Sequence, residues 1–257
     1  MPLIDLQFQT VKTDRELIAH AAGGSQSGSY PNAVESLDLA YQRGYRCFEF
    51  DLQWTRDGEL VGLHDWRSTF AHWFELGRLP ARWRWARRLR PGIALPAPIF
   101  FSLPMRLGWT PLTPERLSDW LGAHPDCWLV TDIKRHNARA LERLAGVFGA
   151  LKSRVLAQVF SLAELEHAQR LGFGRTGWAN YGPNWSLSRL LATLPGRGLD
   201  VLVLDESRLR LPRDTRPLNQ LAAAGLELWV FTVNDAERLH ALPASIRGVI
   251  TDSLMPA

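Results

Sequence analysis

The sequence predicts an α/β fold, a (β/α)8 TIM barrel, from three observations. Apolar runs of strand length recur and alternate with amphipathic, helix-like segments, which is the rhythm of βα units. Runs such as VLVLD (201–205) and WVFTV (229–233) are continuously apolar, as parallel strands buried on both faces are. The length of 257 residues suits one such barrel. A doubly wound open sheet is the rival, but polar residues at the ends of so many separate runs favour a barrel mouth.

The elements follow in order along a single expected domain, residues 1–257. About eight strands are expected among nine apolar runs: 17–21, 47–53, 61–65, 128–134, 155–160, 175–180, 200–205, 227–234 and 248–252. Helix starts lie between them. Thr113 followed by Pro114 is an N-cap with proline at the first helical position, and Ser161 with Glu164 forms a capping-box pattern.

One segment, 66–112, interrupts this rhythm with six prolines after the second barrel strand region. It holds eight arginines, one acidic residue, no lysine and five of the eleven tryptophans, so we expect a small basic, Trp-rich cap inserted on the mouth side. Its RLPARWRWARRLRPG stretch (78–92) fits a peripheral contact with an anionic membrane, a patch for an acidic partner, or a plain solvated lid. Nucleic-acid binding is disfavoured, and no protein partner is predicted.

Composition excludes several classes of protein. Hydrophobic residues make up 46% and charged residues 22%, which is too apolar for a disordered chain. No run approaches the roughly 18 apolar residues of a membrane span. The first sixteen residues lack the apolar core of a signal peptide, so a cytoplasmic location is expected. Cys47 and Cys127 match no metal-binding spacing, and we expect two free thiols on opposite faces, Cys47 toward the barrel interior.

Polar side chains gather where the apolar runs end. Residues two apart on a strand share a face, so Glu49 points with Asp51, and Asp132 points with Lys134. Three carboxylates that converge at a barrel mouth need a cation, and oxygen-only ligands select one hard divalent ion, Mg²⁺ or Ca²⁺. With Lys134 and the metal, the charges cancel, which suits a singly charged phosphodiester. The alternative is a structural salt-bridge network around Lys134.

Two histidines complete this candidate site. His20 and His64 also follow apolar runs, and a pair flanking a phosphate can act as base for the nucleophile and acid for the leaving alkoxide. Which one is the acid is left open. Asn32 is expected to cap the following helix or to touch the site. Asp65 is expected to support its neighbours, and Asp57 with Gly58 to form a hairpin turn.

The same residues resemble a known family. LIAH (17–20), YPNAVES (30–36), FEFD (48–51), DG (57–58) and HD (64–65) are similar to the glycerophosphodiester phosphodiesterase signature, with family-like gaps of 17 residues from Asn32 to Glu49 and 15 from Glu49 to His64. TDIK (131–134), QVFS (158–161), FTVND (231–235) and GVITD (248–252) follow in the family's order. The resemblance spans nearly the whole chain.

The resemblance implies roles for named residues. Glu49, Asp51 and Asp132 would hold the metal, and Lys134 would contact phosphate. His20 and His64 would be the acid and base. Trp229 and Phe231, on one face of their strand, would wall the leaving-group pocket.

Two departures from the family pattern stand out. Ala21 replaces the arginine that follows the first histidine and binds phosphate in the family, so Arg67 is the first candidate to take over that contact. Asp132 replaces a glutamate, as in the sphingomyelinases D built on the same barrel.

The expected function is metal-dependent hydrolysis of glycerophosphodiesters to an alcohol and glycerol phosphate, with a small phosphodiester as substrate, in phospholipid metabolism. The alternatives are a lysophospholipase D or sphingomyelinase D-like phosphodiesterase, and a non-catalytic barrel that binds phosphodiesters.

Overall fold

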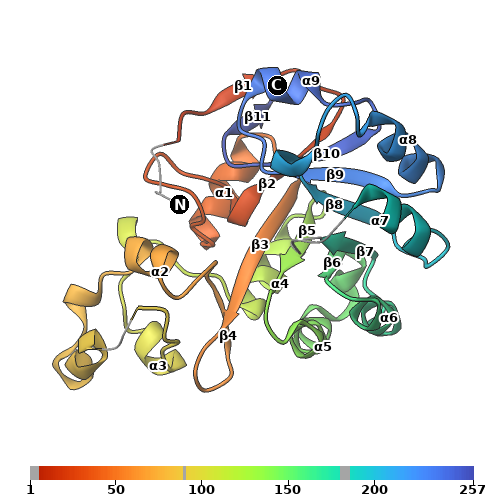
Figure 1. Ribbon diagram of the computed structural model, residues 1–257. Helices are drawn as coiled ribbons and strands as arrows, with labels where there is room; N and C mark the ends of the chain where they lie inside the picture. The colour runs from red at the N-terminus through yellow and green to blue at the C-terminus, as the bar shows by residue number, and fades with distance from the viewer. Residues whose placement is uncertain (1–5, 89–90, 180–185) are drawn as a thin grey trace.

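The computed structural model describes residues 6–88, 91–179 and 186–257, and its centre is a closed barrel of eight parallel strands (Figure 1). The neighbouring order is β2-β10-β9-β8-β7-β6-β5-β3, and pairing of β2 with β3 closes the ring. The predicted (β/α)8 barrel is confirmed, and the open sheet is excluded. The strands are β2 (Glu16–Ala19), β3 (Cys47–Trp54), β5 (Trp128–Asp132), β6 (Val155–Val159), β7 (Arg175–Ala179), β8 (Val201–Asp205), β9 (Glu227–Phe231) and β10 (Ile246–Thr251).

Helices surround the barrel: α1 (Val34–Gln42), α4 (Pro114–Ala123), α5 (Asn137–Phe148), α6 (Leu162–Leu171), α7 (Leu187–Thr193), α8 (Thr215–Ala223) and α9 (Ala236–Ala241). The two predicted helix N-termini are confirmed, because Thr113 caps α4 and the Ser161 hydroxyl, at the start of α6, accepts from the Glu164 amide at 3.2 Å. The returning arm of the capping box differs: the Glu164 carboxylate accepts from the Phe160 amide, one residue earlier. A short parallel pair, β1 (Gln9–Val11) with β11 (Leu254–Pro256), flanks the barrel.

Side-chain alternation along β3 separates two apolar cores. Phe48 and Phe50 pack outward against the helices, whereas Cys47 lies in the barrel interior with residues such as Val130. Cys127 belongs to the outer core, and both thiols are buried and free, as predicted. The same alternation turns Glu49 and Asp51 toward the mouth.

The run at 61–65 differs from its prediction. Its strand, β4 (Leu60–Gly62), pairs antiparallel with the end of β3 rather than joining the barrel. The turn between them has Gly58 at φ 90°, a conformation that glycine adopts without a steric penalty. The hairpin therefore extends past the mouth of the barrel, and its second strand returns toward it. The Leu63 amide donates to the Asp51 carbonyl at 3.2 Å. His64 consequently reaches the mouth from outside the barrel.

Residues 66–112 form a lobe beside the barrel, at the lower left of Figure 1, and its apolar cluster also includes Ala33, Val61 and Leu63. Trp66, Phe70, Trp73 and Phe100 are buried in it. The lobe contains α2 (Ser68–Trp73), α3 (Ala97–Phe100), and 3₁₀ turns at Leu76–Arg78, Ala81–Arg88 and Arg106–Gly108. We call it the cap. Leu89 and Arg90, and the side chains of Arg84, Trp85, Arg87 and Arg88, lie outside the described residues, so the interpretations of the Arg/Trp stretch fall largely outside them too.

In the described ranges, no helix combines the length and the apolar character that crossing a membrane requires.

Candidate active site

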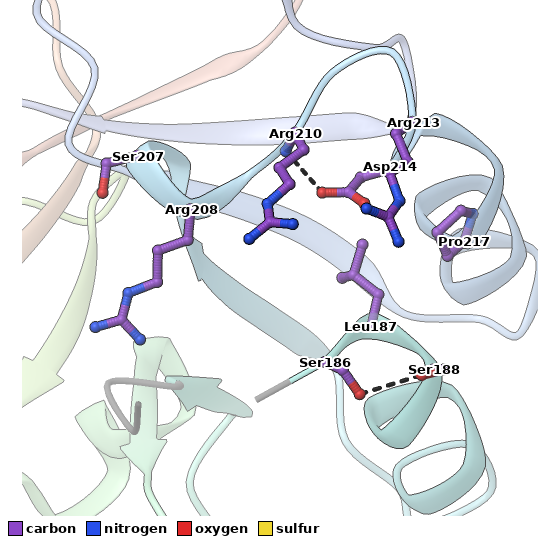
Figure 2. Close-up of a pocket in the computed structure, with 9 residues that line it drawn as sticks. All are labelled: Ser186, Leu187, Ser188, Ser207, Arg208, Arg210, Arg213, Asp214 and Pro217. Carbon is purple, nitrogen blue, oxygen red and sulfur yellow. Dashed lines mark hydrogen bonds between the residues drawn. The ribbon is translucent and has the colours of Figure 1, made fainter. Parts of the chain in front are cut away.

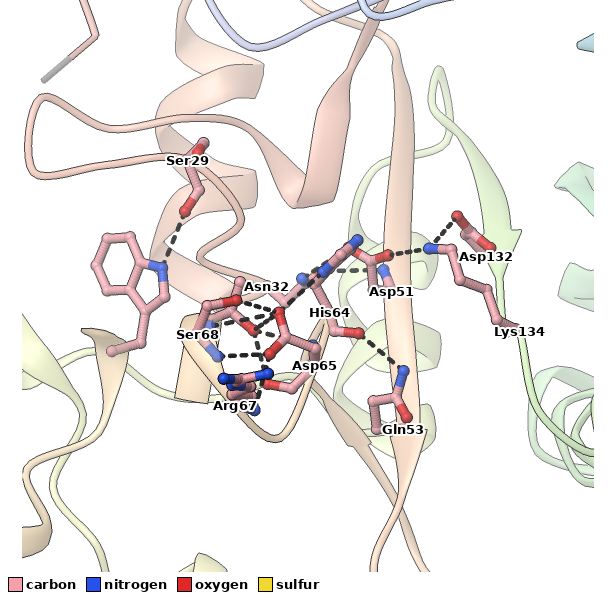
Figure 3. A network of polar contacts seen from close by, with 12 residues as sticks. Ser29, Asn32, Asp51, Gln53, His64, Asp65, Arg67, Ser68, Asp132 and Lys134 are labelled. Carbon is pink, nitrogen blue, oxygen red and sulfur yellow. Dashed lines mark hydrogen bonds and ion pairs between the residues drawn. The ribbon is translucent and has the colours of Figure 1, made fainter. Parts of the chain in front are cut away.

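Adjacent strands bring the three predicted carboxylates together. β3 and β5 pair in parallel with Asp51 opposite Asp132, and Glu49 lies two residues earlier on the same face of β3. One carboxylate oxygen from each residue lies within 4.8 Å of the others, and all three residues are buried. The Lys134 ammonium lies 2.8 Å from Asp132 and 3.3 Å from Asp51 (Figure 3). The structure therefore places the predicted acids and lysine in one cluster.

The cluster fits a cation. Burial, together with Asp51, raises the pKa of Glu49 well above its ordinary value. Burial acts the same way on Asp51, but Lys134 and the histidines hold its pKa below the ordinary value. One Glu49 oxygen accepts from the Ala21 amide at 2.7 Å, and the other, Oε1, is buried with no hydrogen-bond donor among the described residues. A divalent ion would supply the missing positive charge and a partner for this oxygen.

Asn32 fixes the orientation of Asp51. Its amide Nδ2 donates to Asp51 Oδ2 at 3.0 Å, and its Oδ1 accepts from the Asp51 backbone amide at 2.8 Å. Asn32 is fully buried, with φ at 47°. The capping interpretation is wrong, since Ala33 is the N-cap of α1 and bonds with Ser36 instead. Asn32 is therefore part of the carboxylate cluster.

His20 is held between two acids. Its Nδ1 lies 2.8 Å from Asp252, and its Nε2 lies 3.9 Å from Glu49. Burial lowers the pKa of His20, but Asp252 and the carboxylates outweigh burial and raise it to about 9. Asn234 holds Asp252 in place through its side-chain amide at 2.8 Å. Asp252 was absent from the predicted site, although it ends an apolar run just as the predicted residues do.

His64 sits on a tightly braced turn. Its Nδ1 lies 3.2 Å from Asp65, and its carbonyl accepts from Gln53 at 2.8 Å. Asp65 also accepts from the Arg67 amide at 2.7 Å and from the Ser68 amide at 2.6 Å, and Figure 3 shows these contacts converging on its carboxylate. Burial raises the pKa of Asp65, but these hydrogen bonds outweigh burial and lower it. Asp65 therefore supports His64.

The ring of Tyr30 lies between the two imidazoles. Its centroid is 4.7 Å from that of His20 and 4.5 Å from that of His64. Sequence reasoning missed Tyr30, because its only signal was an aromatic residue at the end of a glycine- and serine-rich loop.

The remaining predicted residues occupy different places. Arg67 is exposed at the start of α2, and within the described ranges its guanidinium bonds to none of the site residues. Phe231 ends β9 and so reaches the mouth. Trp229 does not: it donates to Glu227 at 2.7 Å, and it lines a cavity of about 230 Å³ with Glu16 and other residues at the amino ends of the strands. Trp229 lies two residues, about 6.6 Å, before Phe231 along the strand, and its ring lines this cavity rather than the mouth, so its predicted pocket role is wrong.

A larger cavity of about 730 Å³ lies between α7 and the segment after β8 (Figure 2). It contains none of the predicted site residues. Its lining is Ser186, Leu187, Ser188, Ser207, Arg208, Arg210, Arg213, Asp214 and Pro217.

Comparisons with known proteins agree on one family. A model of the "Glycerophosphoryl diester phosphodiesterase family" matches residues 24–120. A Mycobacterium tuberculosis protein named "Probable glycerophosphodiester phosphodiesterase 2" is 28% identical over 91% of this chain and 87% of its own length.

Solved structures agree on the fold. A glycerophosphodiester phosphodiesterase of Thermotoga maritima has a TM-score of 0.70 at 20% identity, over 94% of this chain and 96% of that one. An Oleispira antarctica phosphodiesterase, in complex with the product sn-glycerol-3-phosphate, has a TM-score of 0.63 at 18% identity, over 95% of this chain and 96% of that one.

Proposed function

We propose that this protein hydrolyses glycerophosphodiesters to an alcohol and glycerol phosphate, because it is similar to glycerophosphodiester phosphodiesterases, which are phosphoric diester hydrolases. One observation carries this proposal: two histidines, each with its own carboxylate partner, flank a buried cluster of three acids that pairs with the exposed Lys134. Glu49, Asp51 and Asp132 would hold one divalent ion, Mg²⁺ or Ca²⁺. When bound, the ion would polarise the phosphoryl group and offset the negative charge of the acids.

Side chains of the protein would attract the substrate, transfer the protons and orient the histidines. Lys134 lies on the mouth side of the cluster and would attract the anionic diester. One histidine accepts a proton from the attacking water, and the other donates a proton to the departing alkoxide, so that the products are the alcohol and glycerol phosphate. Asp252 and Asp65 orient the two rings, so that each presents its Nε2 to the substrate. Each proton transfer contributes about 10²–10⁴-fold to the rate.

A leaving-group experiment tests these roles. The variants His20→Ala and His64→Ala would each be assayed on glycerophosphocholine and on a glycerol phosphodiester of p-nitrophenol. A variant that lacks the general acid should still cleave the p-nitrophenyl diester, because p-nitrophenolate departs without a proton. A variant that lacks the general base should be slow on both substrates. We expect one variant of each kind. Equal losses on both substrates for both variants would contradict the assignment of acid and base to this pair.

A lipid substrate is the second candidate, because the exposed large apolar side chains of the described residues, Ile93, Phe101 and Leu107, all belong to the cap. A basic cap with exposed apolar side chains suits contact with an anionic membrane. Such contact would bring the site close to a lysophospholipid in that membrane. Head-group release from a lysophospholipid, with little turnover of deacylated diesters, would favour this candidate. Failure to sediment with anionic vesicles at low salt would contradict the membrane contact.

A non-catalytic barrel is the third interpretation. It predicts that metal and glycerol phosphate bind while no diester is turned over.

A further inference from the structure

Tyr30 is the aromatic residue placed between the two histidines. Its ring meets His20 edge-on, with 71° between the planes, and tilts against His64 at 49°. The residue is half-buried, so part of it remains accessible from the mouth. A substrate that reaches both histidines therefore passes beside Tyr30.

The Tyr30 hydroxyl is available as a donor. Within the described part of the chain it forms no hydrogen bond. Burial and the nearby carboxylates Asp252, Asp51 and Glu49 raise its pKa above the ordinary value, which keeps the hydroxyl protonated at neutral pH. A neutral O–H group in this position can donate to an anion without adding charge.

Each of the other donors at the mouth is paired with a carboxylate. Lys134 pairs with two carboxylates, His20 and His64 are bonded to their acids, and the Ala21 amide donates to Glu49. The Ala21 side chain is a fully buried methyl group, which can make no polar contact with phosphate.

The cap holds the loop that carries Tyr30. The Trp73 indole donates to the Ser29 carbonyl at 2.9 Å, and His72 Nε2 bonds to the Ser27 carbonyl at 2.8 Å. Gly28 has φ at 140°, and a Cβ there would lie 2.8 Å from that His72 nitrogen, so a larger residue would strain the backbone and displace the imidazole. The ring of Tyr30 is thus placed before substrate arrives.

We propose that the Tyr30 hydroxyl donates a hydrogen bond to a non-bridging oxygen of the phosphodiester, the contact that Ala21 cannot make. This proposal rests on the proposed function, because it takes the carboxylate cluster as the place where the phosphate binds.

The test compares three substitutions in the metal-loaded protein. Tyr30→Phe keeps the ring and removes the hydroxyl, and Tyr30→Leu removes both. Tyr41→Phe is the control, because it removes the hydroxyl of a half-buried tyrosine that contacts Asp126 at the surface. We expect Tyr30→Phe to lower kcat/KM on glycerophosphocholine about 10- to 100-fold, the loss typical of a hydrogen bond to a charged group. Its melting temperature should match that of Tyr41→Phe, which should keep full activity.

A second readout does not depend on turnover. Calorimetric titration with sn-glycerol 3-phosphate and with inorganic phosphate should show weaker binding to Tyr30→Phe than to Tyr41→Phe. Unchanged kcat/KM and unchanged phosphate binding in Tyr30→Phe would overturn the proposal, even if Tyr30→Leu were impaired, because the ring alone would then matter. A loss in Arg67→Ala without one in Tyr30→Phe would also overturn it. Phosphate binding that depends on Tyr30, without hydrolysis of any diester, would contradict the proposed function alone.

Discussion

Replacing Asn32 by alanine separates the folding role of this residue from its role in the carboxylate cluster. The substitution removes the donor to Asp51 Oδ2 at 3.0 Å and the acceptor of the Asp51 amide at 2.8 Å. Asn32 is fully buried, so water has no direct path to replace either bond. It also places alanine at φ 47°, a conformation that asparagine tolerates better.

The expected decrease in the free energy of unfolding follows from the two lost hydrogen bonds and the unfavourable backbone conformation. A buried amide left without an acceptor costs about 1–3 kcal/mol, and a hydrogen bond to a charged carboxylate contributes about 1.5–3 kcal/mol. The left-handed backbone adds about 1 kcal/mol for alanine. Because the terms overlap, we expect Asn32→Ala to lower the free energy of unfolding by about 3–5 kcal/mol. Metal affinity should fall about 10- to 100-fold, as it does when residues that orient ligands are removed.

Urea unfolding of the metal-free protein and calorimetric titration with Mg²⁺ and Ca²⁺ measure the two effects. Asn137→Ala is the matched control, because Asn137 is also buried and its amide donates to the Gln158 carbonyl at 2.9 Å. It should lose stability but keep metal affinity. Asn32→Gly, which relieves the backbone strain, should be more stable than Asn32→Ala. A loss of metal affinity in Asn137→Ala equal to that in Asn32→Ala would refute the reasoning.

Three further predictions follow from the site and the cores. Mg²⁺ or Ca²⁺ at a hundredfold excess over Kd should raise the melting temperature by about 5–10 °C, and Asp51→Asn should abolish this shift in scanning calorimetry. Burial lowers the pKa of His20, but Asp252, with Glu49 and Asp51, outweighs burial and raises it from 6.5 to about 9. The metal-free wild-type protein should therefore exceed Asp252→Asn in stability most below pH 6.5, and the difference should shrink as the pH rises through 9; an advantage that grows with pH would contradict this ion pair. Cys47 and Cys127 should both titrate with a thiol reagent in denaturant and react slowly in the native protein, whereas fewer than two thiols in denaturant would indicate a disulfide.

The sequence predicted the acidic cluster because strand geometry is local. A two-residue period decides that Glu49 and Asp51 share a face, and parallel strands end at one side of a barrel, which brings in Asp132. The apolar runs predicted the barrel for the same reason.

Contacts set by tertiary packing were not predictable in this way. The period that aligns Trp229 with Phe231 does not say which of the two reaches the mouth. Tyr30 belongs to a loop whose path depends on hydrogen bonds to the cap, and a loop has no period to interpret. The partnership of Asp252 with His20 joins residues 232 positions apart, so only closure of the barrel reveals it.

The most direct test of the account follows glycerophosphocholine by ³¹P NMR with the wild-type protein in Mg²⁺, Ca²⁺ or EDTA, beside His20→Ala and His64→Ala. We expect the diester signal to be replaced by that of glycerol phosphate only with a divalent ion, and each histidine variant to slow this conversion at least about 100-fold. Metal binding without any conversion, or conversion that survives both substitutions, would contradict the claim that these histidines and carboxylates form a phosphodiesterase active site.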